Sequence, residues 1–111
     1  MWKPTSDKPE IVGELLLAMR TNGDFGVQFT KPPIVIVDAT SADGRWQVDF
    51  LVGKYTLHGK GSPTTRFVWF ELPRALAGEE LRRGWQFSRT NDLWRLECDR
   101  TGERLEGRFF Q

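Results

Sequence analysis

Apolar and polar residues alternate most regularly along Arg45–Val52. Successive side chains of a strand point to opposite faces, so a two-residue period is typical of a strand with one buried face. The apolar face of this segment would carry Trp46, Val48, Phe50 and Val52. We therefore predict a half-buried strand here, followed by a tight turn at Gly53-Lys54 and a second strand over Tyr55–Lys60.

Another pair of strands is predicted around Asn22-Gly23, a dipeptide that favours the positive backbone angles of a two-residue hairpin turn. The segment after it, Asp24–Thr30, alternates apolar and polar residues, and Ile11–Thr21 precedes it. A strand is our interpretation of Ile11–Thr21. A helix over Val12–Met19 is the alternative, because the middle of this segment is apolar without a break.

The third region runs from Lys31-Pro32-Pro33 to the turn Ser41–Gly44. Proline cannot donate a backbone hydrogen bond, so the two prolines should end the preceding strand. The next segment, Ile34–Thr40, begins with four β-branched residues, which are enriched in strands. We expect it to be a central strand of the sheet.

The aromatic segment Arg66–Leu72 predicts a strand buried on both faces. Pro73 then presets the backbone for a first helical position, so we predict a short helix over Pro73–Leu81. Arg82-Arg83-Gly84 would end this helix, since basic residues and a following glycine are typical of a helix C-terminus. A strand is predicted to resume over Trp85–Arg89.

The last predicted hairpin joins Leu93–Asp99 to Arg104–Phe110. A two-residue loop would place Glu97 opposite Glu106, whereas a four-residue loop would place Glu97 opposite Arg108. Repulsion between like charges favours the longer loop.

These elements predict a mainly β fold of the α+β type, with about nine short strands and one helix. A sheet with this many strands has to curl, so we expect a strongly curled antiparallel sheet, an incomplete β-barrel with the short helix as a lid. Residues 1–10 are rich in proline and polar side chains and are expected to form a flexible leader, with Trp2 outside the core. Residues 11–111 would form a single half-barrel domain.

Composition narrows the classes of protein. The chain has 111 residues, 39% of them hydrophobic, and a net charge of +1. This excludes a disordered chain, and the charge argues against nonspecific binding of nucleic acid. No apolar run approaches a membrane span. The first residues contain no apolar signal core, so we expect either a cytoplasmic protein or a periplasmic or outer-membrane protein whose export signal was removed.

Candidate catalytic groups are few. His58 is the only histidine and Cys98 the only cysteine, which leaves too few ligands for a structural zinc site. His58 falls on the polar side of its predicted strand, so we interpret it as a surface residue rather than a catalytic base. Cys98 is expected to be a core thiol. Nine of the eleven arginines lie from Arg66 onward, and interleaved glutamates favour ion pairing over an anion-binding face. We predict no enzymatic activity and no cofactor.

The aromatic residues provide the main positive signal, because most of them share one parity within their strands. The set comprises Phe25, Phe29, Trp46, Phe50, Tyr55, Phe67, Trp69, Trp85, Phe87, Trp94 and Phe109. They are expected to line one concave interior. That interior is either an ordinary filled core or a cavity for a hydrophobic ligand, and the sequence leaves both open.

Several segments, in this order, resemble the lipoprotein-sorting family of bacterial envelopes. They are Gly13-Glu14-Leu15, Asp24–Phe29, Lys31-Pro32-Pro33, Arg45–Phe50, Gly59-Lys60-Gly61 and Leu72-Pro73 before a short helix. The family comprises a periplasmic lipoprotein carrier and an outer-membrane lipoprotein receptor. The resemblance implies an incomplete barrel with a helical lid that takes up acyl chains without catalysis.

Carried onto this sequence, the resemblance implies that Trp46, Phe50, Trp69 and Trp94 form a cavity wall, with Leu72, Leu76 and Leu81 in the lid. Tyr55 and Phe67 complete the predicted ligand-binding set from the aromatic pattern. The expected function is a monomeric, non-enzymatic envelope protein that holds an acyl chain or a lipoprotein. The alternative is a protein-interaction module with a filled core and no ligand cavity.

Overall fold

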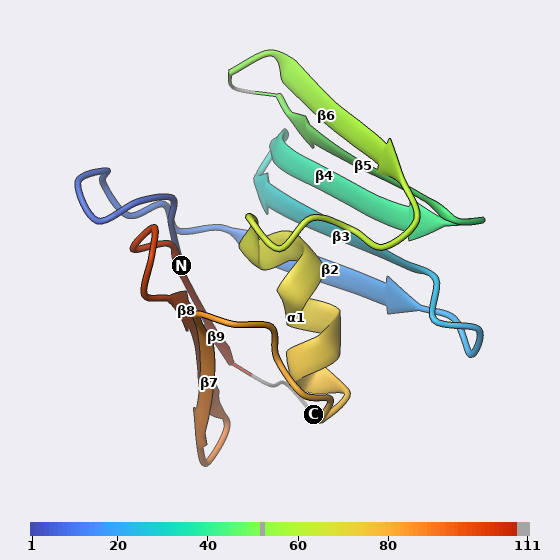
Figure 1. The fold of residues 1–111 in the computed structure, drawn as a ribbon. Coiled ribbons are helices and arrows are strands. Elements are labelled where there is room, and N and C mark those ends of the chain that lie inside the picture. Colours follow the sequence, from blue (N-terminus) through green and yellow to red (C-terminus); the bar gives the residue numbers. More distant parts are fainter. Residues whose placement is uncertain (52, 109–111) are drawn as a thin grey trace. The chain divides into compact units, whose positions relative to one another are not determined.

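The computed structural model describes residues 1–51 and 53–108 and contains two antiparallel sheets and one helix (Figure 1). The mainly β fold class is therefore confirmed. The elements are β1 (Trp2–Lys3), β2 (Glu14–Met19), β3 (Phe25–Lys31), β4 (Ile34–Ala42), β5 (Arg45–Phe50), β6 (Tyr55–Lys60), α1 (Val68–Leu76), β7 (Trp85–Thr90), β8 (Leu93–Cys98) and β9 (Arg104–Arg108).

Two compact units make up the chain. Gly13–Thr64 contains the five strands β2 to β6, and we call it the meander unit. Met1–Val12 and the residues from Thr65 onward contain α1 and the other four strands, and we call this part the helical unit.

In the meander unit each strand pairs with the next one in sequence, in the order β2-β3-β4-β5-β6 (Figure 1). The predicted strands are confirmed here in position, but β5 ends at Phe50 and Leu51 lies in the turn that follows; Val52 lies outside the described residues. The alternative helix over Val12–Met19 is wrong, because Glu14–Met19 is a strand paired with β3.

The predicted two-residue turn at Asn22-Gly23 is wrong. Met19 pairs with Phe25, and the Arg20 N–H donates to the Asp24 carbonyl at 2.8 Å, which leaves a loop of residues 21–23. Gly23 has a φ of 94°, and the Asp24 N–H donates to the side-chain oxygen of Asn22 at 3.0 Å.

One face of the meander sheet is apolar. The strand register places Val27, Ala39 and Val48 in one row across β3, β4 and β5, and all three are buried. Phe29, Val37 and Phe50 form the next row and are buried as well. The side chains at the intervening positions of these strands point to the opposite, polar face.

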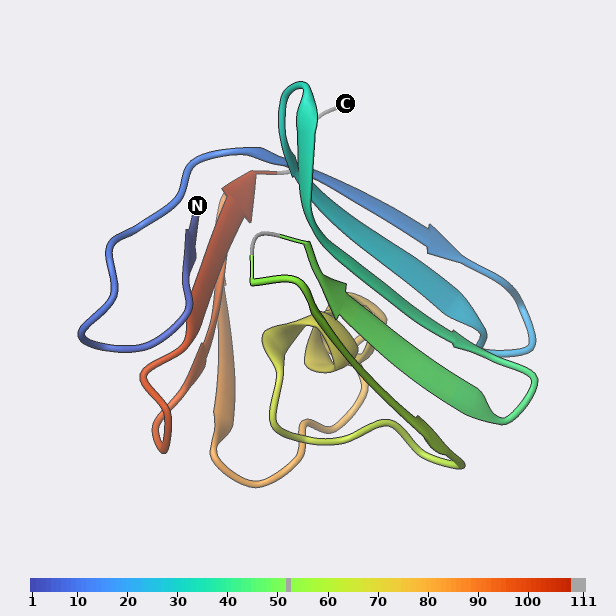
Figure 2. The ribbon, with the colours of Figure 1, turned by 90° about the horizontal axis from the view of Figure 1, so that it is seen from above.

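The sheet of the helical unit has the order β1-β9-β8-β7. Its first strand, β1, lies beside β9 near the N-terminus (Figure 2). This strand corrects the prediction for Trp2, which pairs with Leu105 and is only 6% exposed. The Trp2 ring contacts the Trp69 ring edge-on, with centroids 4.9 Å apart. Trp2 therefore belongs to the core. Cys98 is buried on β8, as predicted.

The predicted strand over Arg66–Leu72 is wrong, because α1 begins at Val68 and ends at Leu76. Pro73 lies inside this helix and not at its start. A short, uninterrupted apolar run fits a buried helix as well as a buried strand, so periodicity could not separate them. The residue before the helix, Phe67, makes no side-chain cap. The cap comes instead from Glu103, which accepts a hydrogen bond from the Val68 N–H at 2.8 Å.

The predicted end of the helix at Gly84 is also wrong. The Gly78 N–H donates to the Ala75 carbonyl at 3.2 Å, and the Glu79 N–H donates to the Arg74 carbonyl at 2.9 Å. Gly78 has a φ of 75°. This pair of hydrogen bonds around a left-handed glycine is the Schellman motif, and it ends the helix six residues earlier than the predicted glycine.

The hairpin of β8 and β9 differs from both predicted registers. Glu97 faces Arg104, and Arg95 faces Glu106. Opposite charges therefore meet across the strands, as the charge argument requires, but through a register that we did not consider. Phe109 and Phe110 lie outside the described residues.

Candidate binding face of the five-stranded sheet

Three rows of side chains occupy the polar face of β4, β5 and β6. The register defines a basic row (Ala42, Arg45, Lys60), a middle row (Thr40, Gln47, His58) and an acidic row (Asp38, Asp49, Thr56). Cross-strand neighbours on one face of an antiparallel pair lie close enough to interact. Each row therefore acts as one local chemical environment.

The basic row contains a direct like-charge pair. Arg45 and Lys60 occupy opposite positions of β5 and β6, and both side chains are exposed. Within residues 1–51 and 53–108, neither side chain forms an ion pair with a carboxylate. Like charges that face each other across strands destabilise a sheet. An anion placed between them would remove that cost.

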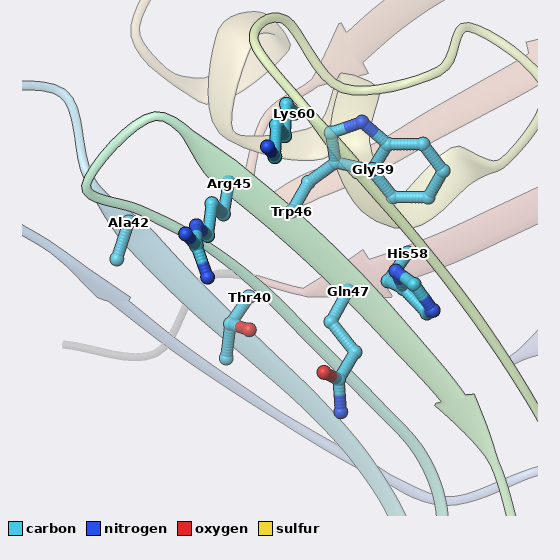
Figure 3. A pocket seen from close by; sticks show the side chains of 8 residues that line it. All are labelled: Thr40, Ala42, Arg45, Trp46, Gln47, His58, Gly59 and Lys60. Atoms are coloured by element: carbon cyan, nitrogen blue, oxygen red, sulfur yellow. The ribbon is translucent and has the colours of Figure 1, made fainter.

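A shallow basin of about 380 Å³ lies over the basic and middle rows (Figure 3). Its lining consists of Thr40, Ala42, Arg45, Trp46, Gln47, His58, Gly59 and Lys60. The hydroxyl, amide and imidazole groups of the middle row add hydrogen-bonding groups beside the two cations. The basin can therefore offer both charge and directional hydrogen bonds to a small polar group.

Trp46 and Gly59 fix the backbone beneath this basin. They face each other across β5 and β6, and the Trp46 indole lies against Gly59 (Figure 3). A methyl group added at Gly59 would come within 2.6 Å of the indole Cζ2. Only glycine allows this close approach without a shift of the ring.

The acidic row lies two residues further along the strands. Thr56 Oγ1 donates to Asp49 at 2.6 Å, and the Gln47 amide donates to the same carboxylate at 3.2 Å. Asp38 faces Asp49 directly. Partial burial raises the pKa of Asp38, and the Asp49 charge raises it further, while a hydrogen bond from Gln28 opposes both effects. The polar face thus concentrates positive charge at one end and negative charge at the other.

The polar face offers groups that can form hydrogen bonds and ion pairs. His58 is exposed in the middle row, as predicted for a surface residue, and it lines the basin beside Gln47. In the described part of the chain, no group of three or more His, Cys, Asp or Glu residues is placed to hold a metal ion. Arginine and lysine side chains with nearby amide and hydroxyl groups are suited to carboxylate or phosphate groups.

Three residues of the predicted ligand-binding set lie in the meander unit. Phe50 is buried, while Tyr55 is 49% exposed and stacks on Phe50 with ring centroids 4.7 Å apart. Trp46 is half-buried against Gly59. The structure therefore brings Phe50 and Tyr55 together on the apolar face.

The other six residues of that set lie in the helical unit. Trp69 and Leu72 have no exposed surface, and Phe67 and Trp94 are buried. Leu76 ends α1, Leu81 follows it, and both are half-buried. Phe67, Trp69, Leu72 and Trp94 are therefore core side chains. Contact with a ligand stays a prediction for every member of the set.

Sequence reasoning missed a buried carboxylate in the helical unit. Glu103 is 3% exposed and accepts hydrogen bonds from Trp2 Nε1 at 2.9 Å and from the Val68 N–H. Burial raises the pKa of Glu103 to about 7, against the effect of these two hydrogen bonds and of the Arg66 charge. Glu103 joins the chain start, the helix start and the loop before β9, which no local pattern could indicate.

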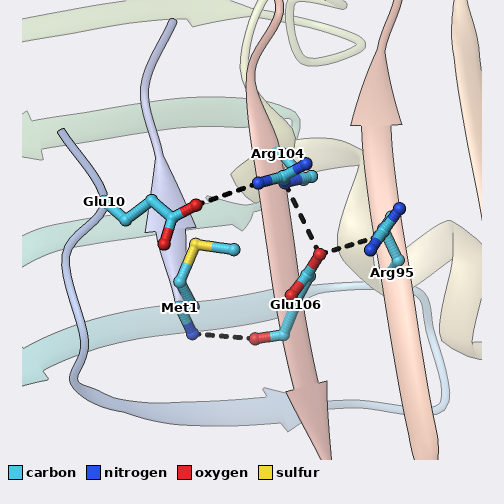
Figure 4. A network of polar contacts seen from close by, with 5 residues as sticks. All are labelled: Met1, Glu10, Arg95, Arg104 and Glu106. Carbon is cyan, nitrogen blue, oxygen red and sulfur yellow. Dashed lines mark hydrogen bonds and ion pairs between the residues drawn. The ribbon is translucent and has the colours of Figure 1, made fainter. Parts of the chain in front are cut away.

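Four of the nine arginines in the helical unit form ion pairs with carboxylates of the described residues, the arrangement that the interleaved glutamates predicted. Arg95 Nε lies 2.7 Å from Glu106, which also contacts Arg104, and Arg104 reaches Glu10 at 3.0 Å (Figure 4). Ion pairs are confirmed for Arg82, Arg95, Arg104 and Arg108. The anion-binding alternative for this arginine-rich part is therefore weakened by neutralisation of these charges.

The sequence did not indicate the basic row. The predicted two-residue turn at Gly53-Lys54 would pair Val52 with Tyr55 and place Arg45 opposite Ser62. The structure instead pairs Phe50 with Tyr55, which places Arg45 opposite Lys60. The available signal was the alternation along β5, which puts Arg45, Gln47 and Asp49 on one face.

Comparisons of the chain with family models, with curated proteins and with solved structures gave no match. The part of the chain that the structure describes contains no helix with the length and apolar character of a membrane span. Function has to be inferred from the geometry of the two units.

Proposed function

We propose that this protein is a non-enzymatic binding module that holds an anionic group of its partner, a carboxylate or a phosphate, at the basic row of the meander unit. The observation that carries this proposal is the Arg45–Lys60 pair, two exposed cations on facing positions with no carboxylate within ion-pair distance in the described residues.

Electrostatics supports an anion at this position. The two cations repel each other when the row is empty, and a bound anion converts that repulsion into two attractive contacts. The Arg45 guanidinium can bind a carboxylate or phosphate with two parallel hydrogen bonds. Both side chains are solvent-exposed, so the affinity for an isolated anion is expected to be weak and to fall as salt is added.

The side chains that were predicted to line a cavity are mostly buried, which favours a binding site on the surface over one in the interior. Trp69 and Leu72 have no exposed surface, and Phe50 is only 8% exposed. These residues already bury their apolar area against protein, so an acyl chain would have to displace them. This favours the interaction-module alternative with a filled core.

A titration of isotope-labelled protein with inorganic phosphate and with acetate tests the proposal. We expect backbone amide shifts confined to Arg45, Gln47, Lys60 and their neighbours, with dissociation constants on the order of millimolar. The Arg45→Gln/Lys60→Gln variant should lose these shifts, whereas Arg95→Gln should keep them. Equal shifts in wild type and in the double variant would refute the proposal.

Binding of an acyl chain remains a second proposal, with one observation in its favour. The apolar face of the meander sheet is partly accessible at its two edge strands, where Met19 is 48% and Tyr55 49% exposed. This function would require an incomplete, curled barrel with α1 as its lid, and it would place the protein in the bacterial envelope.

Native mass spectrometry after expression in a bacterial host tests the second proposal. Co-purified lipid that is lost in the Trp69→Ala and Leu76→Ala variants would support it, with Arg83→Ala as a surface control. A clean protein mass, without change in tryptophan fluorescence on addition of fatty acid, would contradict it.

A further inference from the structure

The polar face of the meander unit carries opposite charges at its two ends. Arg45 and Lys60 are the charged residues of the basic row, Asp38 and Asp49 are those of the acidic row, and the middle row lies between them. Successive rows are two residues apart, so the basic and acidic rows are separated by roughly 13–14 Å along the strands. This spacing is fixed by β5, which contributes Arg45, Gln47 and Asp49 to the three rows.

This pattern is complementary to itself under one particular rotation. A two-fold axis that runs across the strands, above the middle row, reverses the strand direction of the second copy. It therefore lays the acidic row of one copy over the basic row of the other. A two-fold axis along the strands would instead lay basic row on basic row. The charges thus select one symmetric arrangement and oppose the other.

We propose that the polar face docks a second copy of this chain, with Asp49 of each copy meeting Arg45 of the other. This inference rests on the proposed function, because it names the anionic group that the basic row receives. On the flanking strands, Asp38 of each copy would lie over Ala42 of the other, and Lys60 would lie over Thr56. One member of each like-charge pair would then face an opposite charge, Arg45 in the basic row and Asp49 in the acidic row.

The composition of the face is consistent with a second copy as occupant. Arg45, Gln47 and Lys60 are exposed, and Asp49 is half-buried. The net charge of the chain is only +1, so two copies repel each other weakly. The middle row would meet itself across the axis, where Thr40, Gln47 and His58 supply both donors and acceptors.

The face is small and polar, so the dimer should be weak. Interfaces below about 1,200 Å² of total buried surface belong to transient complexes. We expect a dissociation constant on the order of 0.1–1 mM at low salt, rising at least tenfold in 0.5 M NaCl, because the contacts are exposed ion pairs.

Charge exchange between two variants tests the inference. One variant carries Arg45→Glu/Lys60→Glu, and the other carries Asp38→Lys/Asp49→Lys. Sedimentation equilibrium at protein concentrations up to about 1 mM should show weak dimers for the wild type and monomers for each variant alone. An equimolar mixture of the two variants should form a heterodimer. The control Lys8→Glu/Arg83→Glu makes the same charge change in the helical unit and should leave dimerisation unchanged.

Three results would overturn the inference: a wild type that stays monomeric, a dimer that persists in both variants, or a mixture that does not associate. Circular dichroism of each variant checks that it is folded. If Arg45→Glu/Lys60→Glu is unfolded, Arg45→Gln/Lys60→Gln replaces it. If Asp38→Lys/Asp49→Lys is unfolded, Asp49→Asn replaces it. The phosphate titration tests the anion site separately from the dimer. Phosphate shifts at Arg45 and Lys60 in a protein that stays monomeric would refute the second copy while leaving the anion site in place.

Discussion

Both units contain a tryptophan that lies against a glycine on the neighbouring strand, with a shallow basin beside it. In the meander unit Trp46 faces Gly59 beneath a basin of about 380 Å³. In the helical unit Trp94 faces Gly107 beside a basin of about 200 Å³. The two basins differ in the arginine next to the tryptophan. Arg95 is neutralised by Glu106 at 2.7 Å, whereas Arg45 faces another cation, Lys60.

The same packing of a tryptophan ring against a glycine thus occurs beside two different sets of charges. The charged side chains next to each basin decide what that basin can bind. In the helical unit the exposed Arg95 and the buried Glu71 each have an ion-pair partner within the protein, Glu106 and Arg82. In the meander unit Arg45 and Lys60 have no such partner among the described residues. We therefore assign stability to the first set and binding to the second.

The largest expected effect comes from Glu103. Replacing it by alanine would leave Trp2 Nε1 and the Val68 N–H without their buried acceptor, so we expect a loss of roughly 3–5 kcal/mol in the free energy of unfolding. Asp49→Ala, on the exposed face, should cost less than about 1 kcal/mol. Urea denaturation of both variants gives the comparison. Equal losses would contradict the division between structural and binding charges.

The pH dependence of stability should also follow Glu103. Its pKa is about 7 in the folded protein and 4.5 is its ordinary value, so the folded state binds more protons between these two pH values. The free energy of unfolding should therefore be highest, as far as Glu103 contributes, below pH 4.5 and should fall as the pH rises to about 7, by roughly 3 kcal/mol.

Glu103→Gln provides the control for this dependence. Glutamine cannot ionise, so the fall between pH 4.5 and 7 should disappear from its urea midpoints, whatever its absolute stability. An unchanged pH profile in Glu103→Gln would show that another group is responsible.

The two glycines should differ in their tolerance of alanine. A Cβ at Gly107 would lie 2.3 Å from Trp94 Cζ2, and Trp94 is only 6% exposed, so its ring has little room to move. We expect Gly107→Ala to cost about 2–3 kcal/mol. Trp46 is half-buried and can shift, so Gly59→Ala should cost about 1 kcal/mol and displace the basin floor. Thermal denaturation of both variants measures the difference, and a larger cost at Gly59 would contradict it.

The sequence predicts the meander unit better than the helical unit, for a physical reason. In the meander unit each strand pairs with its neighbour in sequence, and local signals such as Asn22-Gly23 indicate where the chain turns, although not the length of the loop. In the helical unit the decisive contacts are remote. The cap of α1 comes from Glu103, 35 residues after Val68, and Trp2 is held by the same carboxylate 101 residues away. Local patterns carry no record of either contact.

The candidate site can be predicted from the sequence only in part. The strands that carry Arg45 and Lys60 follow from the alternation of apolar and polar residues. Their register does not, because the predicted turn at Gly53-Lys54 would place Arg45 opposite Ser62 instead of Lys60. The absence of an ion-pair partner for either cation among the described residues is not predictable, because glutamates and aspartates elsewhere in the chain could have reached them. That feature depends on the three-dimensional arrangement of each unit's carboxylates, such as Asp49, which is held by Gln47 and Thr56.

The smallest expected change in free energy is that of phosphate binding, and it should depend on which arginine is replaced. Removing one of two exposed cations, as in Arg45→Gln, should weaken phosphate binding about three- to tenfold, equivalent to about 0.7–1.4 kcal/mol. Arg95→Gln should leave the affinity unchanged because Arg95 is already paired with Glu106. Equal effects of the two substitutions would remove the distinction between the basins.

The most direct test uses the two tryptophans as reporters in a single sample. The indole N–H resonances of Trp46 and Trp94 are followed by nuclear magnetic resonance while inorganic phosphate is added at constant ionic strength. Our account predicts a saturable shift of the Trp46 resonance, because its indole packs against Gly59, which lines the basin of the basic row, and no shift of the Trp94 resonance. A shift of Trp94 that equals or exceeds that of Trp46 would contradict the assignment of binding to the meander unit.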